Sequence, residues 1–361
     1  MKPPNIKDIA RSLGISIGTV DRALHGRPDV SPITRAQVLK KAEQLGYRPN
    51  VAARALKLNR RLRIGVHFPE QIASFFDPLR AGVRAAASAA MGVNVDLVFQ
   101  SFPRLDEGDL ELLGADAGRK FDGILITPGN PDRIEPALRA LARQGIAIVC
   151  VASDAPHCER LASVAVDAHA SGAIAAELFS RTISKAGYLA TITGELTTLD
   201  HAEKLRGFAA NLALYAPHLT LLPAIESHES PKEAYRQAKA LLSRMPHPLG
   251  IYLSTANSLP VLRALEELNL FGEVQVITTD LFSELVPYIE SGKVLATLYQ
   301  RPFSQGRTAF ELLLRYLVDG STPKAVTRLA PHIILRSNLS LFSVPQDSPS
   351  SPSHHALTKN T

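Results

Sequence analysis

Apolar residues close to the start of the chain recur at the spacing of an amphipathic helix. One face of a first predicted helix carries four of them, Ile6, Ile9, Ala10 and Leu13. Gly14 interrupts this pattern, and Ser16 follows as a residue suited to cap a second helix through its hydroxyl oxygen. Val20 and Leu24 supply the buried side of that second helix. The pattern therefore predicts two short helices joined at a glycine.

A third helix is predicted between Ser31 and Gly46. Ser31 is a capping residue, and the proline after it occupies the first turn, where its missing N–H leaves no hydrogen bond unmade. Its apolar side comprises Val38, Leu39, Ala42 and Leu45. Three short helices in this order predict a helix-turn-helix unit. Its second helix turns four residues outward, Ile17, Gly18, Asp21 and Arg22.

Positive charge is concentrated in this helical segment. Residues 1–60 hold twelve lysines and arginines against four acids, a net charge of +8, so the rest of the chain carries −2 of the total of +6. Because counterion release on phosphate neutralisation drives sequence-independent binding to nucleic acid, this charge favours a polyanionic partner at that end of the chain.

From residue 62 onward, short apolar runs alternate with longer helical stretches. The predicted strands are 62–68, 93–99, 123–127, 146–151, 164–166, 188–193, 221–225, 250–253, 274–279 and 296–299. Predicted helices between them include 78–90, 131–144, 171–183, 202–214, 232–244 and 259–268. This alternation is typical of parallel sheets flanked by helices. Roughly 280 residues exceed one typical hydrophobic core, so we expect two α/β lobes.

Six short motifs of the helical segment are in register with one known family. They are IKDIA at 6–10, GTV at 18–20, RAL at 22–24, VSP at 30–32, TR at 34–35 and LGYRPN at 45–50. Residues 5–58 resemble the DNA-binding segment of the lactose-repressor (LacI-type) family of bacterial transcription regulators. The alternative for a small helical cluster is a packing or dimerisation module without DNA binding.

The resemblance implies ten residues that face double-stranded DNA: Ser16, Ile17, Gly18, Thr19, Asp21, Arg22, Ser31, Asn50, Arg54 and Leu56. Ile17, Gly18 and Arg22 take the positions that meet base edges. Arg22 is suited to a bidentate guanine contact and Ile17 to a thymine methyl group. Asp21 stands where the family commonly has a small hydroxyl residue, and it either pairs with a neighbouring arginine or accepts from a cytosine amine.

The resemblance also implies a hinge helix that inserts Leu56 into the minor groove. Such wedging needs two copies side by side, which implies a homodimer on a near-palindromic operator. On the residues alone, an ordinary linker with a hydrophobic anchor is the alternative.

Residues 62 to about 340 resemble, more loosely, the two-lobed effector domains related to periplasmic binding proteins. Eight positions match its ligand contacts: Phe75, Phe76, Asn130, Asp154, Lys204, Ser254, Asp280 and Gln300. Acids and amides at strand ends bind paired hydroxyls, and aromatic faces cover C–H surfaces, so the implied effector is a sugar or related polyol. Lys204 replaces an arginine of the family pattern, and the segment LSTAN at 253–257 also departs from it.

Each of these positions also has a structural interpretation. Phe75 and Phe76 fit a hydrophobic core, and Asp154 or Asp280 fits the cap of a helix.

Signatures of enzymes, cofactors and metals are missing from the sequence. No Gly-x-Gly-x-x-Gly follows the first strand, and residues 114–120 lack the spacing of a phosphate loop. The histidines lack metal-ligand spacing, and Cys150 and Cys158 read as reduced thiols. We therefore expect no catalytic activity, no cofactor and no metal. An exported sugar-binding protein and an α/β enzyme with a nucleic-acid module are the alternatives.

The predicted organisation has four parts. Residues 1–48 form the helix-turn-helix domain, 49–61 the hinge helix and linker, 62–340 the effector-binding and dimerisation domain, and 341–361 a disordered tail. No export signal and no long apolar run are recognised, which favours a cytoplasmic protein without a membrane partner.

Overall fold

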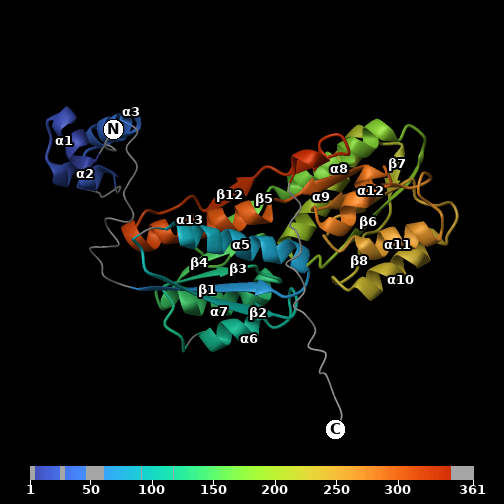
Figure 1. Cartoon of the computed structure of the whole chain (residues 1–361), viewed down its shortest axis with the longest axis horizontal. Coiled ribbons are helices and arrows are strands. Elements are labelled where there is room, and N and C mark those ends of the chain that lie inside the picture. The colour runs from blue at the N-terminus through green and yellow to red at the C-terminus, as the bar shows by residue number, and fades with distance from the viewer. Residues whose placement is uncertain (1–4, 25–28, 46–60, 91, 117, 343–361) are drawn as a thin grey trace, which may run out of the picture. The chain divides into compact units, whose positions relative to one another are not determined.

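The computed structural model describes residues 5–24, 29–45, 61–90, 92–116 and 118–342 (Figure 1). The chain divides into two compact units. The first comprises residues 1–168, 195–202 and 302–329, and the second comprises 169–194, 203–301 and 330–361. None of the helices among the described residues is long and apolar enough to cross a membrane.

Three helices form the N-terminal segment of the first unit: α1 (Ile6–Leu13), α2 (Ile17–Leu24) and α3 (Pro32–Gln44). Asn5 and Asp8 make a reciprocal capping box at the start of α1, and Gly14 ends it in the left-handed conformation with φ 65°. The three helices share a small core of Ile9, Ala10, Val20, Ala23, Val30, Val38 and Ala42. The predicted helix-turn-helix pattern is confirmed, although Leu39 of α3 is 49% exposed and does not join this core.

The first sheet has six parallel strands in the order β12-β5-β4-β3-β1-β2. Their bounds are β1 (Leu62–Pro69), β2 (Val95–Phe102), β3 (Gly123–Ile126), β4 (Ala147–Val151), β5 (Ala162–Val166) and β12 (Val326–Leu329). The central strands β3 and β4 are buried along their whole length, as is typical of a parallel sheet covered on both faces.

Helices cover both faces of this sheet, as Figure 1 shows. Helices α6 (Asp109–Asp116) and α7 (Pro131–Arg143) supply Leu113, Ile134 and Leu138 to the core on one face. On the other face, α5 (Ala73–Ala89) packs against α13 (Pro302–Asp319). A Cβ atom at Gly82 of α5 would lie 2.1 Å from the carbonyl oxygen of Phe303. The two helix backbones therefore approach to a distance that only glycine allows.

The second sheet has seven strands, with β13-β11-β10-β9-β6-β7 in order and β8 also paired with β6. The strands are β6 (Gly187–Thr193), β7 (Leu219–Leu221), β8 (Ile225–Glu226), β9 (Gly250–Leu253), β10 (Gln275–Thr279), β11 (Ala296–Tyr299) and β13 (His332–Ile334). All pairings are parallel except that of β13 with β11.

Two helical layers enclose this second sheet. One face packs on α8 (Ala168–Thr182) and α9 (Leu199–Tyr215) through residues such as Phe179 and Phe208. The other packs on α10 (Pro231–Leu242), α11 (Leu259–Glu267) and α12 (Val286–Glu290). Short 3₁₀ helices occupy Ser283–Leu285 and Leu339–Leu341.

The predicted alternation of strands and helices is confirmed, with differences in detail. Helix α5 begins at Ala73 rather than at Pro78, so that Phe75 and Phe76 lie within it. The predicted strand 221–225 is two shorter strands, β7 and β8. Strands β12 and β13 were not predicted, because both are short, partly polar edge strands whose pairing partners lie far away in the sequence.

A buried polar pair lies between β1 and α6. The Nδ1 atom of His67 is 3.3 Å from Oδ2 of Asp116, and both side chains are fully buried. A Cβ atom at Gly65 would lie 2.7 Å from Nε2 of His67, so the imidazole occupies the space over that glycine. Burial lowers the pKa of His67 to about 4 and raises the pKa of Asp116 to about 6.

Replacing Gly82 tests the close packing of α5 on α13. We expect Gly82→Ala to lower the free energy of unfolding by about 1–3 kcal/mol, because the added methyl group displaces backbone atoms. Gly114→Ala is the matched control, since a Cβ there meets no atom within 4 Å. It should leave stability unchanged or raise it by up to about 1 kcal/mol through helix propensity. Urea denaturation measures both, and equal stabilities of the two variants would contradict the packing argument.

The Asp116 carboxyl predicts a pH-dependent stability. Its raised pKa means that burial of the ionised form costs free energy above about pH 6, and that this cost disappears as the pH falls toward 3.8. We therefore expect Asp116→Asn to be more stable than the native protein at neutral pH, with the advantage shrinking between pH 6 and 3.8.

His67→Asn should show the opposite trend. The lowered pKa of His67 makes the native protein lose stability as the pH falls from 6.5 to about 4, and the variant lacks that loss. Urea denaturation across this range measures both differences. A pH-independent difference for Asp116→Asn would refute the assignment.

Candidate functional site

The exposed side of α2 carries the residues predicted to meet DNA bases. Ser16 caps the helix, because its Oγ accepts a hydrogen bond of 3.0 Å from the backbone N–H of Thr19. Ile17 is 49% exposed although it is apolar, and Gly18 beside it is exposed as well. The Nε of Arg22 lies 3.2 Å from a carboxylate oxygen of Asp29, in an ion pair whose arginine side chain is 41% exposed. The helix thus presents an apolar and a cationic group from one surface.

Ser31 also has a structural role. Its Oγ accepts a hydrogen bond of 3.1 Å from the backbone N–H of Thr34 and so caps α3. The remaining DNA-facing predictions, Asn50, Arg54 and Leu56, lie outside the described residues, as do residues 343–361 of the predicted tail.

The carboxyl edge of the second sheet gathers several of the predicted effector contacts. Ser254 follows β9, Asp280 follows β10 and Gln300 follows β11, and these three strands are neighbours in the sheet. Because parallel strands end at the same edge, the topology places the three residues together. All three are buried, with at most 6% of each exposed.

Lys204 of α9 joins this group through a chain of hydrogen bonds. Its Nζ donates to Oε1 of Gln300 at 2.9 Å and to the carbonyl oxygen of Ser254 at 3.3 Å. The Nε2 atom of Gln300 in turn donates to Oδ2 of Asp280 at 2.7 Å, and the backbone N–H of Gln300 donates to Oδ1 at 2.9 Å. Lys204 is only 1% exposed, so the chain links a buried cation to a buried carboxylate through an amide.

Glycines allow α9, the helix that carries Lys204, to pack closely on α8. A Cβ atom at Gly172 of α8 would lie 1.9 Å from the carbonyl oxygen of Lys204. One at Gly207 of α9 would lie 2.1 Å from the carbonyl oxygen of His169. The backbones of the two helices are therefore in contact at Lys204.

A second buried carboxylate at this edge was not predicted from the sequence. Glu229 follows β8, and its carboxylate accepts a hydrogen bond from the hydroxyl of Thr255, whose oxygen lies 2.8 and 2.6 Å from the two carboxylate oxygens. Both residues are 2% exposed. His228 and Glu229 have φ angles of 49° and 52°, in the left-handed region. The signal in the sequence was a run of polar residues, 227–230, directly after a strand; Asp280 likewise follows a strand directly.

The predicted contacts in the first unit are held by neighbours within that unit. Phe75 and Phe76 are 6% and 3% exposed, their rings meet edge to face at 5.0 Å, and Phe76 also stacks on Phe68. This is the arrangement expected of core residues. Their contact with an effector stays a prediction.

Asn130 and Asp154 are likewise engaged locally. The Oδ1 atom of Asn130 accepts a hydrogen bond of 3.4 Å from the backbone N–H of Arg133 and caps α7. Asp154 forms a two-pronged ion pair with Arg160 and accepts a hydrogen bond of 2.8 Å from the hydroxyl of Ser163. Structural roles therefore account for both side chains, and their effector contacts also stay predictions.

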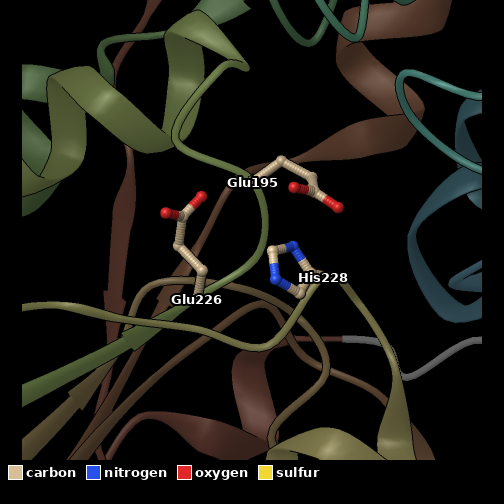
Figure 2. Close-up of side chains that lie close together, drawn as sticks. All are labelled: Glu195, Glu226 and His228. Carbon is tan, nitrogen blue, oxygen red and sulfur yellow. The ribbon is translucent and has the colours of Figure 1, made fainter.

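One group among the described residues has the composition of a metal site, and Figure 2 shows its three side chains. Glu226 and His228 belong to the second unit, and Glu195 belongs to the first. The group is therefore not a site built within either unit, and we assign no metal to it.

Two family models match the sequence. The model for bacterial regulatory proteins of the lacI family matches residues 5–50, and the model for the periplasmic binding protein domain matches residues 64–321.

Two named relatives match nearly the whole chain, and one solved structure matches the fold of its larger part. Catabolite control protein A of Priestia megaterium is 25% identical over 91% of this chain and 97% of its own length. The HTH-type transcriptional repressor PurR of Vibrio parahaemolyticus is 24% identical over 92% and 98%. GanP, a glucose-galactose binding protein from Geobacillus stearothermophilus, superimposes with a TM-score of 0.70 at 25% identity, covering 78% of this chain and 99% of that one.

The buried chain of hydrogen bonds predicts different effects for two substitutions of Asp280. Asp280→Ala removes the carboxylate at its end, and we expect a loss of about 3–5 kcal/mol in the free energy of unfolding, as for other broken buried pairs. Asp280→Asn keeps an oxygen that can accept from Gln300 and should cost less. Chemical denaturation of the full protein compares the two, and unchanged stability in both variants would show that the carboxylate does not anchor these hydrogen bonds.

Proposed function

The chain belongs to the lacI family of bacterial regulatory proteins and carries a periplasmic binding protein domain, and from this premise we propose that it is a repressor whose operator affinity is set by a sugar-like effector. It is a DNA-binding regulator and not an enzyme, as its relatives are regulators. The observation that carries the effector part is the buried chain from Lys204 through Gln300 to Asp280.

The helices α1 to α3 read the DNA in this proposal. Ile17 and Arg22 project from the exposed side of α2 and enter the major groove, where the guanidinium group of Arg22 contacts a guanine and Ile17 contacts a thymine methyl group. The ion pair with Asp29 holds Arg22 in place before DNA binds. Leu56 wedges the minor groove at the centre of a near-palindromic site.

The carboxyl edge of the second sheet binds the effector. Asp280, Gln300 and Lys204 offer carboxylate, amide and ammonium groups within one hydrogen-bonded chain, which suits neighbouring hydroxyl groups of a sugar or polyol. GanP is a glucose-galactose binding protein with the same fold, which supports this class of ligand. Because these groups are buried and bonded to one another, a bound effector replaces hydrogen bonds within the protein rather than hydrogen bonds to water.

A homodimer in the cytoplasm completes the proposal. Two copies place one reading helix in each of two successive major grooves, and the effector changes DNA affinity by binding the DNA-competent and DNA-incompetent states unequally. Residues 1–48 read the DNA, 49–61 form the hinge, 62–340 bind the effector and dimerise, and 341–361 form a tail. The bacterial chromosome lies in the cytoplasm, which places its regulator there.

Selection of DNA from a random duplex pool by the purified protein tests this function. We expect an enriched near-palindromic sequence. Arg22→Ala should reduce the preference for it over unrelated DNA by about 1–3 kcal/mol per guanine contact, while sequence-independent binding persists. Lys185→Ala, an exposed cation of the second unit, is the control. Failure to enrich any sequence would overturn the proposal.

The effector half has its own readout. Thermal shift against a panel of sugars and polyols identifies the ligand, and DNA binding is then measured with and without it. Asp280→Asn should lose the response to that ligand and keep its affinity for the selected DNA. A variant with undiminished ligand affinity by calorimetry would refute the site.

A further inference from the structure

A basic pocket lies at the edge of the first sheet where its strands β1, β2 and β3 begin. It has a volume of about 390 Å³ and is lined by Arg61, Arg63, Asp96, Lys120, Phe121 and Asp122. Arg61 directly precedes β1 and Arg63 is its second residue, Asp96 is the second residue of β2, and the other three residues come directly before β3. These strands are neighbours, and every lining residue belongs to the first unit.

Cations outnumber the carboxylates that face them in this pocket. Asp96 is shared by two arginines, with one oxygen 3.0 Å from Nη2 of Arg61 and the other 3.7 Å from Nε of Arg63. Asp122 accepts a hydrogen bond of 2.8 Å from the backbone N–H of Arg63. Lys120 is exposed and adds a third cation. The pocket therefore keeps a net positive charge after its internal pairings.

The arginine donors remain accessible to an anion. The guanidinium carbon of Arg63 lies 5.3 Å from the ring centroid of Phe121, so the ring covers one face of the group. The side chains of Arg61 and Arg63 are 64% and 44% exposed. Arginine forks match the geometry of phosphate oxygens, and an aromatic ring behind a guanidinium limits the rotamers that binding must freeze.

The position of the pocket in the chain favours one source of phosphate. Arg61 directly follows residues 46–60, which join it to the helix-turn-helix segment. Arg61 and Arg63 therefore lie at the first residues of the domain that the sequence reaches after the DNA-binding helices. A small phosphorylated ligand offers the same chemistry, but nothing else in the lining favours it over a polyanion already bound by the same chain.

We propose that Arg61, Arg63 and Lys120 form a second DNA contact that binds a backbone phosphate of the duplex held by the helix-turn-helix segment. This inference rests on the proposed DNA binding. The contact is independent of sequence, because it engages only phosphate, and it anchors the effector domain to the DNA directly rather than through the linker alone.

The salt dependence of binding tests this contact. Fluorescence anisotropy of the full chain with a labelled random-sequence duplex, over a series of KCl concentrations, gives the slope of log K against log salt. Each lost phosphate contact reduces that slope by about 0.9. We expect Arg61→Gln/Arg63→Gln to reduce it by roughly 0.9, the value for one phosphate, and Lys120→Gln to reduce it by less than the double variant.

A charge-matched control separates the pocket from net charge. Arg143→Gln/Lys185→Gln removes two exposed cations elsewhere and should leave the slope at the native value. A native slope in the pocket double variant, or an equal reduction in the control, would overturn the proposal. Calorimetry with inorganic phosphate is the second arm. Phosphate binding that the double variant loses, without a change in DNA slope, would assign the pocket to a small anion instead.

Failure of this phosphate contact can be told apart from failure of the proposed DNA binding. A native protein that binds no duplex refutes DNA binding altogether, whereas native binding with an unaltered slope in the double variant refutes only this contact. Melting temperatures of the variants confirm that they are folded.

Discussion

The buried ammonium group of Lys204 is the constraint on which the candidate effector site depends. A lysine that is 1% exposed needs hydrogen-bond acceptors and a compensating charge within reach, since desolvation of an isolated ammonium ion is prohibitive. The side-chain oxygen of Gln300 is the acceptor, and its amide nitrogen donates a hydrogen bond to the carboxylate of Asp280. The edge of the sheet thus holds a set of buried polar groups whose donors and acceptors are already fixed by one another.

Close helix packing surrounds the site. Helix α9, which carries Lys204, lies close to α8 at Gly172 and Gly207, where a single methyl group would force the helices apart. In the first unit, Gly82 serves the same purpose between α5 and α13. Glycines at close helix contacts therefore set the spacing of the helices in both units.

The two units use the edges of their sheets differently. In the second unit, buried groups at the carboxyl edge satisfy one another and suit a small polyhydroxylated ligand. In the first unit, Asn130 caps a helix and Asp154 pairs with Arg160. The amino edge of that sheet carries exposed, partly paired cations. A neutral ligand is recognised by buried hydrogen bonds and a polyanion by accessible charge, so burial separates the two kinds of site.

The sequence by itself determined the order and type of most elements. Periodicities of two and of 3.6 residues, capping residues and Gly14 are local signals, and they identified the three N-terminal helices and ten stretches of strand. Resemblance to the effector domains of a known family pointed to Asp280 and Gln300, and their strand-end position and residue type agreed with it. Tertiary structure alone decided which groups interact, because residues 204, 280 and 300 are separated by long stretches of chain and meet only through the parallel order of β9, β10 and β11. Edge strands β12 and β13, the pairing of Glu229 with Thr255 and the basic pocket likewise depend on non-local contacts, for which a local pattern carries no signal.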